Sequence, residues 1–211
     1  MKYSVVLFDL DGTLTDSKPG IINSIQYALN ALNLPIPANI DTMLGPPLWK
    51  SFVEICGVAE DAVDDAVAKY REYFNAKGMF ENSVYDGIGE LLACLQKAGL
   101  KLAVATSKPE FYAKQILEHF DLAHYFTTIA GSEMDGTRSE KAEVIAYALE
   151  NFRGATSVMI GDRKHDILGA KACQIDSIGV IWGYGSRDEL HAAAPTHLAS
   201  NTNELYNIIC S

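Results

Sequence analysis

Five short apolar segments, each followed by a polar residue or a glycine, are the feature that most constrains how this chain can fold. They read YSVVLF, LKLAVA, YFTTIA, SVMI and SIGVIW, at residues 3–8, 100–105, 125–130, 157–160 and 177–182. Short apolar strands are typical of parallel sheets with both faces covered. Helical patterns accompany them, over residues 87–99, 110–120, 140–151, 165–173 and 203–209. The pattern predicts an α/β fold with a doubly wound parallel sheet.

The interval after the first strand breaks this alternation. It contains helical patterns and no strand pattern, with the helical stretches at residues 16–32, 48–56 and 61–74. We therefore expect residues 15–81 to form an all-helical cap domain. The core domain would consist of residues 1–14 and 82–211.

The charge balance excludes two classes of partner. The 211 residues include 17 Lys and Arg against 27 Asp and Glu, for a formal net charge of −10. Nucleic acids and anionic membranes both attract clustered basic residues, so neither is an expected partner.

The four cysteines form no C-x-x-C pair, and no apolar stretch is long enough for a signal peptide or a membrane span. We expect a cytoplasmic protein with reduced thiols, either a monomer or a homodimer.

Two pairs of carboxylates follow predicted strands. Asp9 and Asp11 belong to the motif D-L-D-G-T after the first strand, and Asp162 and Asp166 belong to G-D-R-K-H-D after the fourth. Each pair alone has a local explanation, an Asp-Gly turn in one case and a helix with Asp162 as N-cap in the other. The carboxyl ends of parallel strands share one edge, so we expect all four carboxylates to meet. Two such charges about 4 Å apart repel by about 4 kcal/mol at an effective dielectric of about 20. The cluster therefore calls for a cation, and oxygen ligands favour Mg²⁺.

Two further polar signals stand at strand and helix ends. Thr106 and Ser107 follow the second core strand, and Ser107 with Glu110 also fits a capping box. A helix that begins there would offer hydroxyl and N–H groups to an anion. Lys141 opens the helix after the third core strand, where the helix dipole disfavours a cation. Lys141 is either exposed to solvent or held at this position to bind a ligand.

Taken in order, these motifs resemble those of haloacid-dehalogenase-superfamily phosphatases. D-x-D-G-T, a strand-ending Thr-Ser, a lysine and G-D-x-x-x-D follow one another as in that superfamily. V-Y-D-G at residues 84–87 and W-G-Y-G at residues 182–185 are similar to its phosphoglycolate-phosphatase-like and 5′-nucleotidase-like branch. The resemblance covers the whole chain. It implies a Rossmann-like sheet of order 3-2-1-4-5, with a helical cap inserted after the first motif.

The resemblance also implies a role for each matched residue. Asp9 would be the nucleophile that forms an aspartyl phosphate, and Asp11 would be the general acid and then the general base. Lys141 would neutralise the charge of Asp9 and of the transferred group. The phosphate-binding residues would be Gly12, Thr106, Ser107 and Lys141.

The same resemblance implies a Mg²⁺ cofactor and its ligands. Asp9, the backbone oxygen of Asp11 and the carboxylate of Asp162 would hold the ion. Asp166 would support the site, either through a metal-bound water or by orienting Lys141.

The implied function is Mg²⁺-dependent hydrolysis of small phosphate monoesters, with phosphoglycolate and nucleoside 5′-monophosphates as the first candidate substrates. The segment with Pro46, Trp49 and Lys50 resembles the cap loop that faces the substrate in this family. Trp49 could stack on a base and Lys50 could meet a carboxylate or a phosphate. In the alternative, Trp49 packs inside the cap and Lys50 is solvated.

Two other functions remain open at this point. A sugar-phosphate mutase of the same superfamily keeps both aspartates of the first motif. A non-catalytic module that binds a phosphorylated metabolite would use the same fold. Dehalogenation is disfavoured, because dehalogenases of this fold lack the second carboxylate, here Asp11.

Overall fold

The computed structural model describes residues 2–211, and the chain divides into two compact units. The first, the core unit, consists of Met1–Thr15 and Val84–Ser211. The second, the cap unit, consists of Asp16–Ser83. Two short strands, β2 (Thr15–Asp16) and β3 (Ser83–Val84), pair where the chain passes from one unit to the other.

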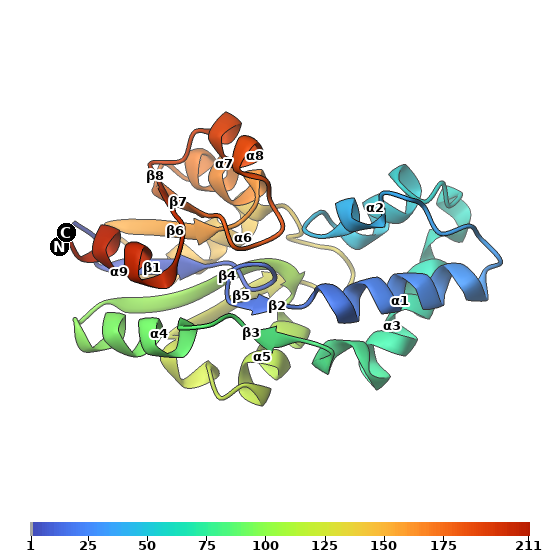
Figure 1. Ribbon diagram of the computed structural model, residues 1–211, viewed down its shortest axis with the longest axis horizontal. Helices are drawn as coiled ribbons and strands as arrows, with labels where there is room; N and C mark the ends of the chain where they lie inside the picture. The colour runs from blue at the N-terminus through green and yellow to red at the C-terminus, as the bar shows by residue number, and fades with distance from the viewer. Residues whose placement is uncertain (1) are drawn as a thin grey trace. The chain divides into compact units, whose positions relative to one another are not determined.

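The core unit is built on a parallel sheet of six strands, in the order β5-β4-β1-β6-β7-β8 (Figure 1). The strands are β1 (Val5–Phe8), β4 (Lys101–Pro109), β5 (Thr128–Ser132), β6 (Ser157–Gly161), β7 (Asp176–Val180) and β8 (His197–Ala199). The α/β class and the predicted order of the first five strands are confirmed. The sixth strand, β8, escaped prediction because it has only three residues and begins with an exposed histidine.

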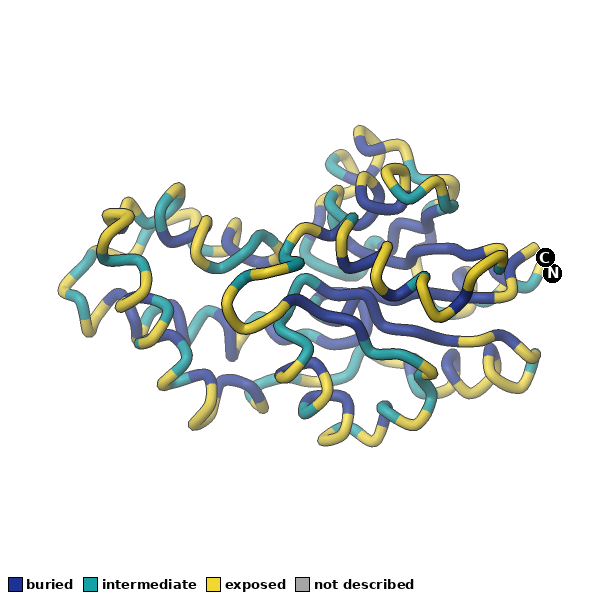
Figure 2. Tube along the Cα trace, turned by 180° about the vertical axis from the view of Figure 1, so that it is seen from behind, coloured by how far each residue is buried: buried dark blue, intermediate teal, exposed yellow. Residues whose placement is uncertain are grey.

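Helices cover the sheet, and they end close to the predicted positions. They are α4 (Ile88–Lys97), α5 (Glu110–His119), α6 (Lys141–Leu149), α7 (Lys164–Ala172), α8 (Arg187–Ala193) and α9 (Thr202–Cys210). The short α8 was not predicted. Strand β1 lies at the centre of the sheet with all four residues buried, as the dark strands of Figure 2 show. One of its faces, through Val5 and Leu7, packs with Val144 and Ile145 of α6 in an apolar cluster.

The cap unit is helical between its two connecting strands. Its helices are α1 (Lys18–Ala31), α2 (Leu48–Glu54) and α3 (Val63–Ala76), with short 3-10 turns between and after them. Helices α1 and α3 pack together and bury Ile25, Leu29 and Phe74. Within residues 2–211, none of the helices combines the length and the apolar character that crossing a membrane requires.

Candidate active site

The central strands bring predicted site residues to one edge of the sheet. Phe8, the last residue of β1, is level with Val104 of β4 and Ile160 of β6. The backbone N–H of Asp9 then donates a hydrogen bond to the carbonyl of Ile160 at 2.9 Å. The residues that come directly after Phe8, Val104 and Ile160 therefore lie next to one another, toward the carboxyl edge of the parallel sheet.

Lys141 joins two of the predicted carboxylates. Its Nζ lies 2.8 Å from Oδ1 of Asp9 and 2.9 Å from Oδ1 of Asp166, and it donates to the carbonyl of Ala105 at 3.2 Å. Burial alone would lower the pKa of Lys141, but the charges of Asp166 and Asp9 outweigh it and raise the pKa above its usual value. Lys141 is therefore a buried, charged group, and the alternative of a solvated lysine is wrong.

Three buried carboxylates form a cluster fit for a cation. Oxygen atoms of Asp9, Asp162 and Asp166 lie within 4.8 Å of one another. Burial, together with the neighbouring charges, raises the pKa of Asp9 to about 6 and that of Asp162 to about 8. Like charges this close in a buried site are unfavourable without a counter-ion, and carboxylate oxygens suit Mg²⁺. The residues present thus fit a divalent cation.

Asp162 is enclosed by backbone on several sides. It accepts hydrogen bonds from Oγ1 of Thr13 at 3.2 Å and from the backbone N–H of Tyr184 at 2.7 Å. A Cβ placed on Gly12, which has φ +84°, or on Gly183 would overlap the Asp162 side chain. These close approaches explain why glycine is needed in both loops. The prediction of Asp162 as a helix N-cap is wrong, since that position is taken by Arg163.

Asp166 has both oxygens engaged by the chain. Besides the ion pair with Lys141, its Oδ2 accepts a hydrogen bond from the backbone N–H of Arg163 at 3.0 Å. This is the reciprocal bond of a capping box at the start of α7. The ion pair fits a role in orienting Lys141, and the place of Asp166 in the carboxylate cluster also fits a role at the metal.

Asp11 lies outside the carboxylate cluster, contrary to the expectation that all four would meet. Its Oδ2 is 2.7 Å from Nζ of Lys108. Its Oδ1 is buried and, among the described residues, receives no hydrogen bond. The sequence did not predict this pairing of Lys108 with Asp11, although the place of Lys108 directly after Thr106 and Ser107 was a usable signal.

The segment with Thr106 and Ser107 continues the strand rather than starting a helix. Strand β4 extends to Pro109, which pairs with Ser132 of β5, and α5 begins only at Glu110. The predicted capping box at Ser107 is therefore wrong, because pairing with β5 prevails over the local helix-start signal. Thr106 is buried at the carboxyl edge of the sheet, and its Oγ1 accepts from the N–H of Lys108 at 3.3 Å.

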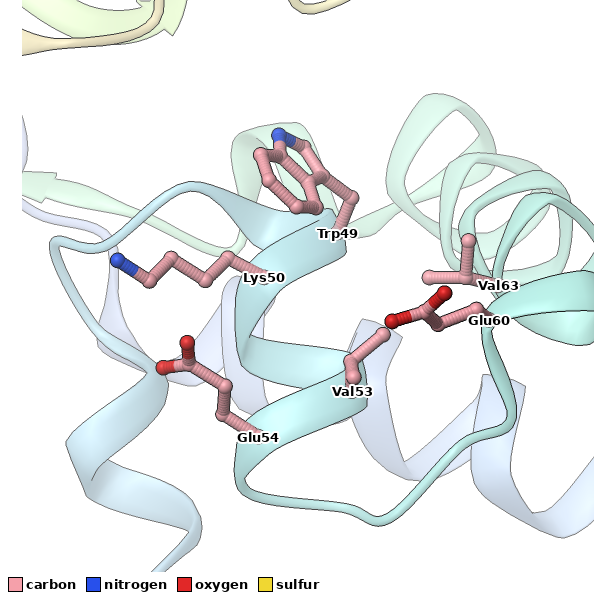
Figure 3. Close-up of a pocket in the computed structure, with 6 residues that line it drawn as sticks. All are labelled: Trp49, Lys50, Val53, Glu54, Glu60 and Val63. Carbon is pink, nitrogen blue, oxygen red and sulfur yellow. The ribbon is translucent and has the colours of Figure 1, made fainter.

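The predicted cap residues lie at the start of α2. Trp49 and Lys50 belong to its first turn and line a cavity of about 420 Å³, completed by Val53, Glu54, Glu60 and Val63 (Figure 3). Trp49 is 50% exposed, so it does not pack inside the cap. Lys50 is exposed, as the alternative expected. Pro46 lies in the preceding loop, and the cavity lining does not include it.

Comparison with known proteins agrees with this architecture. The chain is 44% identical to a 5′-nucleotidase of Pseudomonas aeruginosa, over 99% of this chain and 96% of that protein. It is 45% identical to the tyrosine-protein kinase PtkA of Mycobacterium tuberculosis, over 91% of this chain and 67% of PtkA. More distant relatives are named phosphoglycolate phosphatase.

A solved structure and a family pattern agree as well. The crystal structure of a predicted phosphatase from Clostridium acetobutylicum is 46% identical and superposes with a TM-score of 0.94, covering 100% of this chain and 99% of its own. Residues 6–180 match the sequence pattern of haloacid dehalogenase-like hydrolases. A match over that much of the length shows that the chain belongs to the haloacid dehalogenase-like hydrolase family.

Proposed function

We propose that this hydrolase is a Mg²⁺-dependent phosphatase of small phosphate monoesters, acting through an aspartyl phosphate on Asp9. The observation that carries the proposal is the buried array in which Lys141 bridges Asp9 and Asp166 beside Asp162. Phosphoryl transfer depends mainly on positioning and on neutralising charge, and this array supplies both. The family membership and the relatives named phosphatase support the same reaction class.

In the first step a carboxylate oxygen of Asp9 forms a bond to phosphorus. The bond to the leaving oxygen breaks, its electron pair stays on that oxygen, and Asp11 supplies the proton. In the second step water attacks phosphorus, the bond to Asp9 breaks, and Asp11 takes the proton of the water. Lys141 holds Asp9 in place and offsets the negative charge that gathers there.

Asp9, Asp162 and the backbone oxygen of Asp11 would hold the Mg²⁺ ion, which would offset the charge of the phosphate. Asp166 would act on the reaction through Lys141. Gly12, after β1, and Thr106 and Ser107, in the last part of β4, would contact the phosphate. Hydroxyl and N–H groups at such positions are suited to phosphate oxygens.

We place nucleoside 5′-monophosphates first among the substrates and phosphoglycolate second. The half-exposed Trp49 offers an aromatic face, which suits a base better than a two-carbon acid. The 5′-nucleotidase name of a relative that matches nearly the whole chain supports this order. A cytoplasmic location is consistent with four free cysteines.

The test is phosphate release from a panel of esters with Mg²⁺, compared by kcat/KM. The panel holds nucleoside monophosphates, phosphoglycolate, sugar phosphates and an aryl phosphate. A nucleotide about a hundredfold above the rest, or about 2.7 kcal/mol of selective transition-state binding, would establish the proposed substrate class. Conversion of a sugar phosphate into its isomer would indicate a mutase instead, and binding without turnover would indicate a non-catalytic module. A parallel assay with ATP and a tyrosine peptide tests the activity that the name of the mycobacterial relative describes.

A further inference from the structure

The pairing of β4 with β5 is irregular near the end of β4. Ala105 pairs with Ala130 and Pro109 pairs with Ser132, so three residues of β4 stand opposite one residue of β5, Gly131. Extra residues on one strand form a bulge, which turns side chains out of their regular alternation. Lys108 lies within this bulge.

The neighbouring strand is built to accept this bulge. A Cβ on Gly131 would lie 2.5 Å from the carbonyl oxygen of Lys108 and 2.6 Å from the backbone nitrogen of Glu110. Ser132 donates through Oγ to the carbonyl of Ser107 at 2.9 Å. The bulge is therefore fixed by a hydrogen bond and by the absence of a side chain at Gly131.

Lys108 contacts Asp11 at this bulge. Nζ lies 2.7 Å from Oδ2 of Asp11, and the two side chains are only 6% and 17% exposed. A buried ammonium group is costly unless it is paired, so this contact is much more constrained than a surface ion pair.

This contact distinguishes the two oxygens of Asp11. Oδ2 is held by Lys108, whereas Oδ1 is buried without a hydrogen bond from the described residues. A buried oxygen without a donor is uncommon, and a catalytic role is one established reason for it. Oδ1 is thus the oxygen left available for proton exchange.

We propose that Lys108 is a positioning residue, which holds Oδ2 of Asp11 so that Oδ1 exchanges the proton with the leaving group and with water. The inference rests on the proposed function and assigns one more residue to it. In the second step, water oxygen bonds to phosphorus, the electron pair of the broken bond returns to Asp9, and Oδ1 of Asp11 receives the proton. A carboxylate that rotates freely performs this transfer less often, because reaction needs close alignment.

The test is the Lys108→Met variant with an aryl phosphate, followed through both steps. An aryl oxide leaves with little help from an acid, so formation of the phosphoenzyme should change little, whereas its hydrolysis still needs the base. We expect kcat to fall about tenfold or more and KM to fall with it, so that kcat/KM changes by less than about threefold. Phosphorylated protein should accumulate in the steady state, as measured by intact mass after acid quench.

Two further variants serve as comparisons for Lys108→Met. Lys108→Gln keeps an N–H donor, on a side chain one bond shorter, and should recover part of kcat. Lys114→Met, which removes an exposed lysine of α5 paired with Glu110, should match the wild type. Melting temperature and circular dichroism of each variant show that the fold is retained.

Other outcomes would overturn the inference. If kcat/KM falls as far as kcat and no phosphorylated protein accumulates, Lys108 binds the substrate phosphate or supports the fold instead. An unchanged kcat would exclude the positioning role. Failure of the proposed function is recognised separately, because the wild-type enzyme would then release no phosphate from any ester of the panel.

Discussion

Asp166 and Lys141 form a fully enclosed ion pair, with Oδ1 of Asp166 at 2.9 Å from Nζ of Lys141 and side-chain exposures of 0% and 5%. The second oxygen of Asp166 accepts from the backbone N–H of Arg163. Both oxygens of Asp166 therefore contact the chain, as those of Asp162 also do. In the proposed mechanism Asp166 acts through Lys141.

The Asp166→Asn variant separates this role from metal binding. We expect kcat to fall about ten- to a hundredfold, as is common for residues that orient others at such sites. The Mg²⁺ concentration that gives half-maximal activity should stay near the wild-type value, because the proposed ligands remain. A large rise in that concentration would mean that Asp166 holds the metal, directly or through water.

Asp9→Asn tests the nucleophile. The variant keeps an oxygen that can accept the 2.8 Å hydrogen bond from the N–H of Leu10, so the fold should persist. Turnover and acid-stable protein phosphate should both disappear, because a neutral amide does not attack phosphorus. Asp188→Asn, an exposed position in α8, is the matched control. Wild-type activity in Asp9→Asn would refute the assignment.

Metal binding should depend on pH in a defined direction. The pKa of Asp162 is 3.8 in the unfolded chain, and burial raises it to about 8 in the folded protein. Between these pH values the Asp162 carboxyl is protonated in the folded protein and ionised in the unfolded chain. The free energy of unfolding of the metal-free protein should therefore fall as pH rises through this window. Mg²⁺ binds the ionised carboxylates, so its stabilising effect should grow over the same range.

Urea unfolding with EDTA and with Mg²⁺, at pH values near 6 and near 8, measures both effects. Asp162→Asn should weaken the pH dependence and the response to Mg²⁺ together. Equal stabilisation by Mg²⁺ at the two pH values would contradict the carboxylate site.

Trp49→Ala tests the cap. Stacking of a base on an aromatic side chain contributes about 1–3 kcal/mol, so kcat/KM for nucleoside monophosphates should fall about tenfold. The value for an aryl phosphate should fall much less. Phe80→Ala, another exposed aromatic position of the cap unit, is the control. Equal losses for both substrates would show that Trp49 does not recognise the base.

Several features could be predicted from local patterns. The apolar runs identified β1, β4, β5, β6 and β7, because buried strands must be apolar on both faces. The same reasoning placed Asp9 and Asp162 at one edge of the sheet. The short elements β8 and α8 were not predicted, because three to seven residues show too little periodicity.

The sequence by itself determined the order of the elements and the residues that end each central strand, since both follow from local composition. The tertiary structure decided which side chains pair. Lys108 and Asp11 are 97 residues apart, and they meet where β4 has its irregularity opposite Gly131. Ser107 likewise carried a local helix signal that pairing with β5 overrode. Such contacts depend on strand register and on space left by neighbouring residues, which no local pattern encodes.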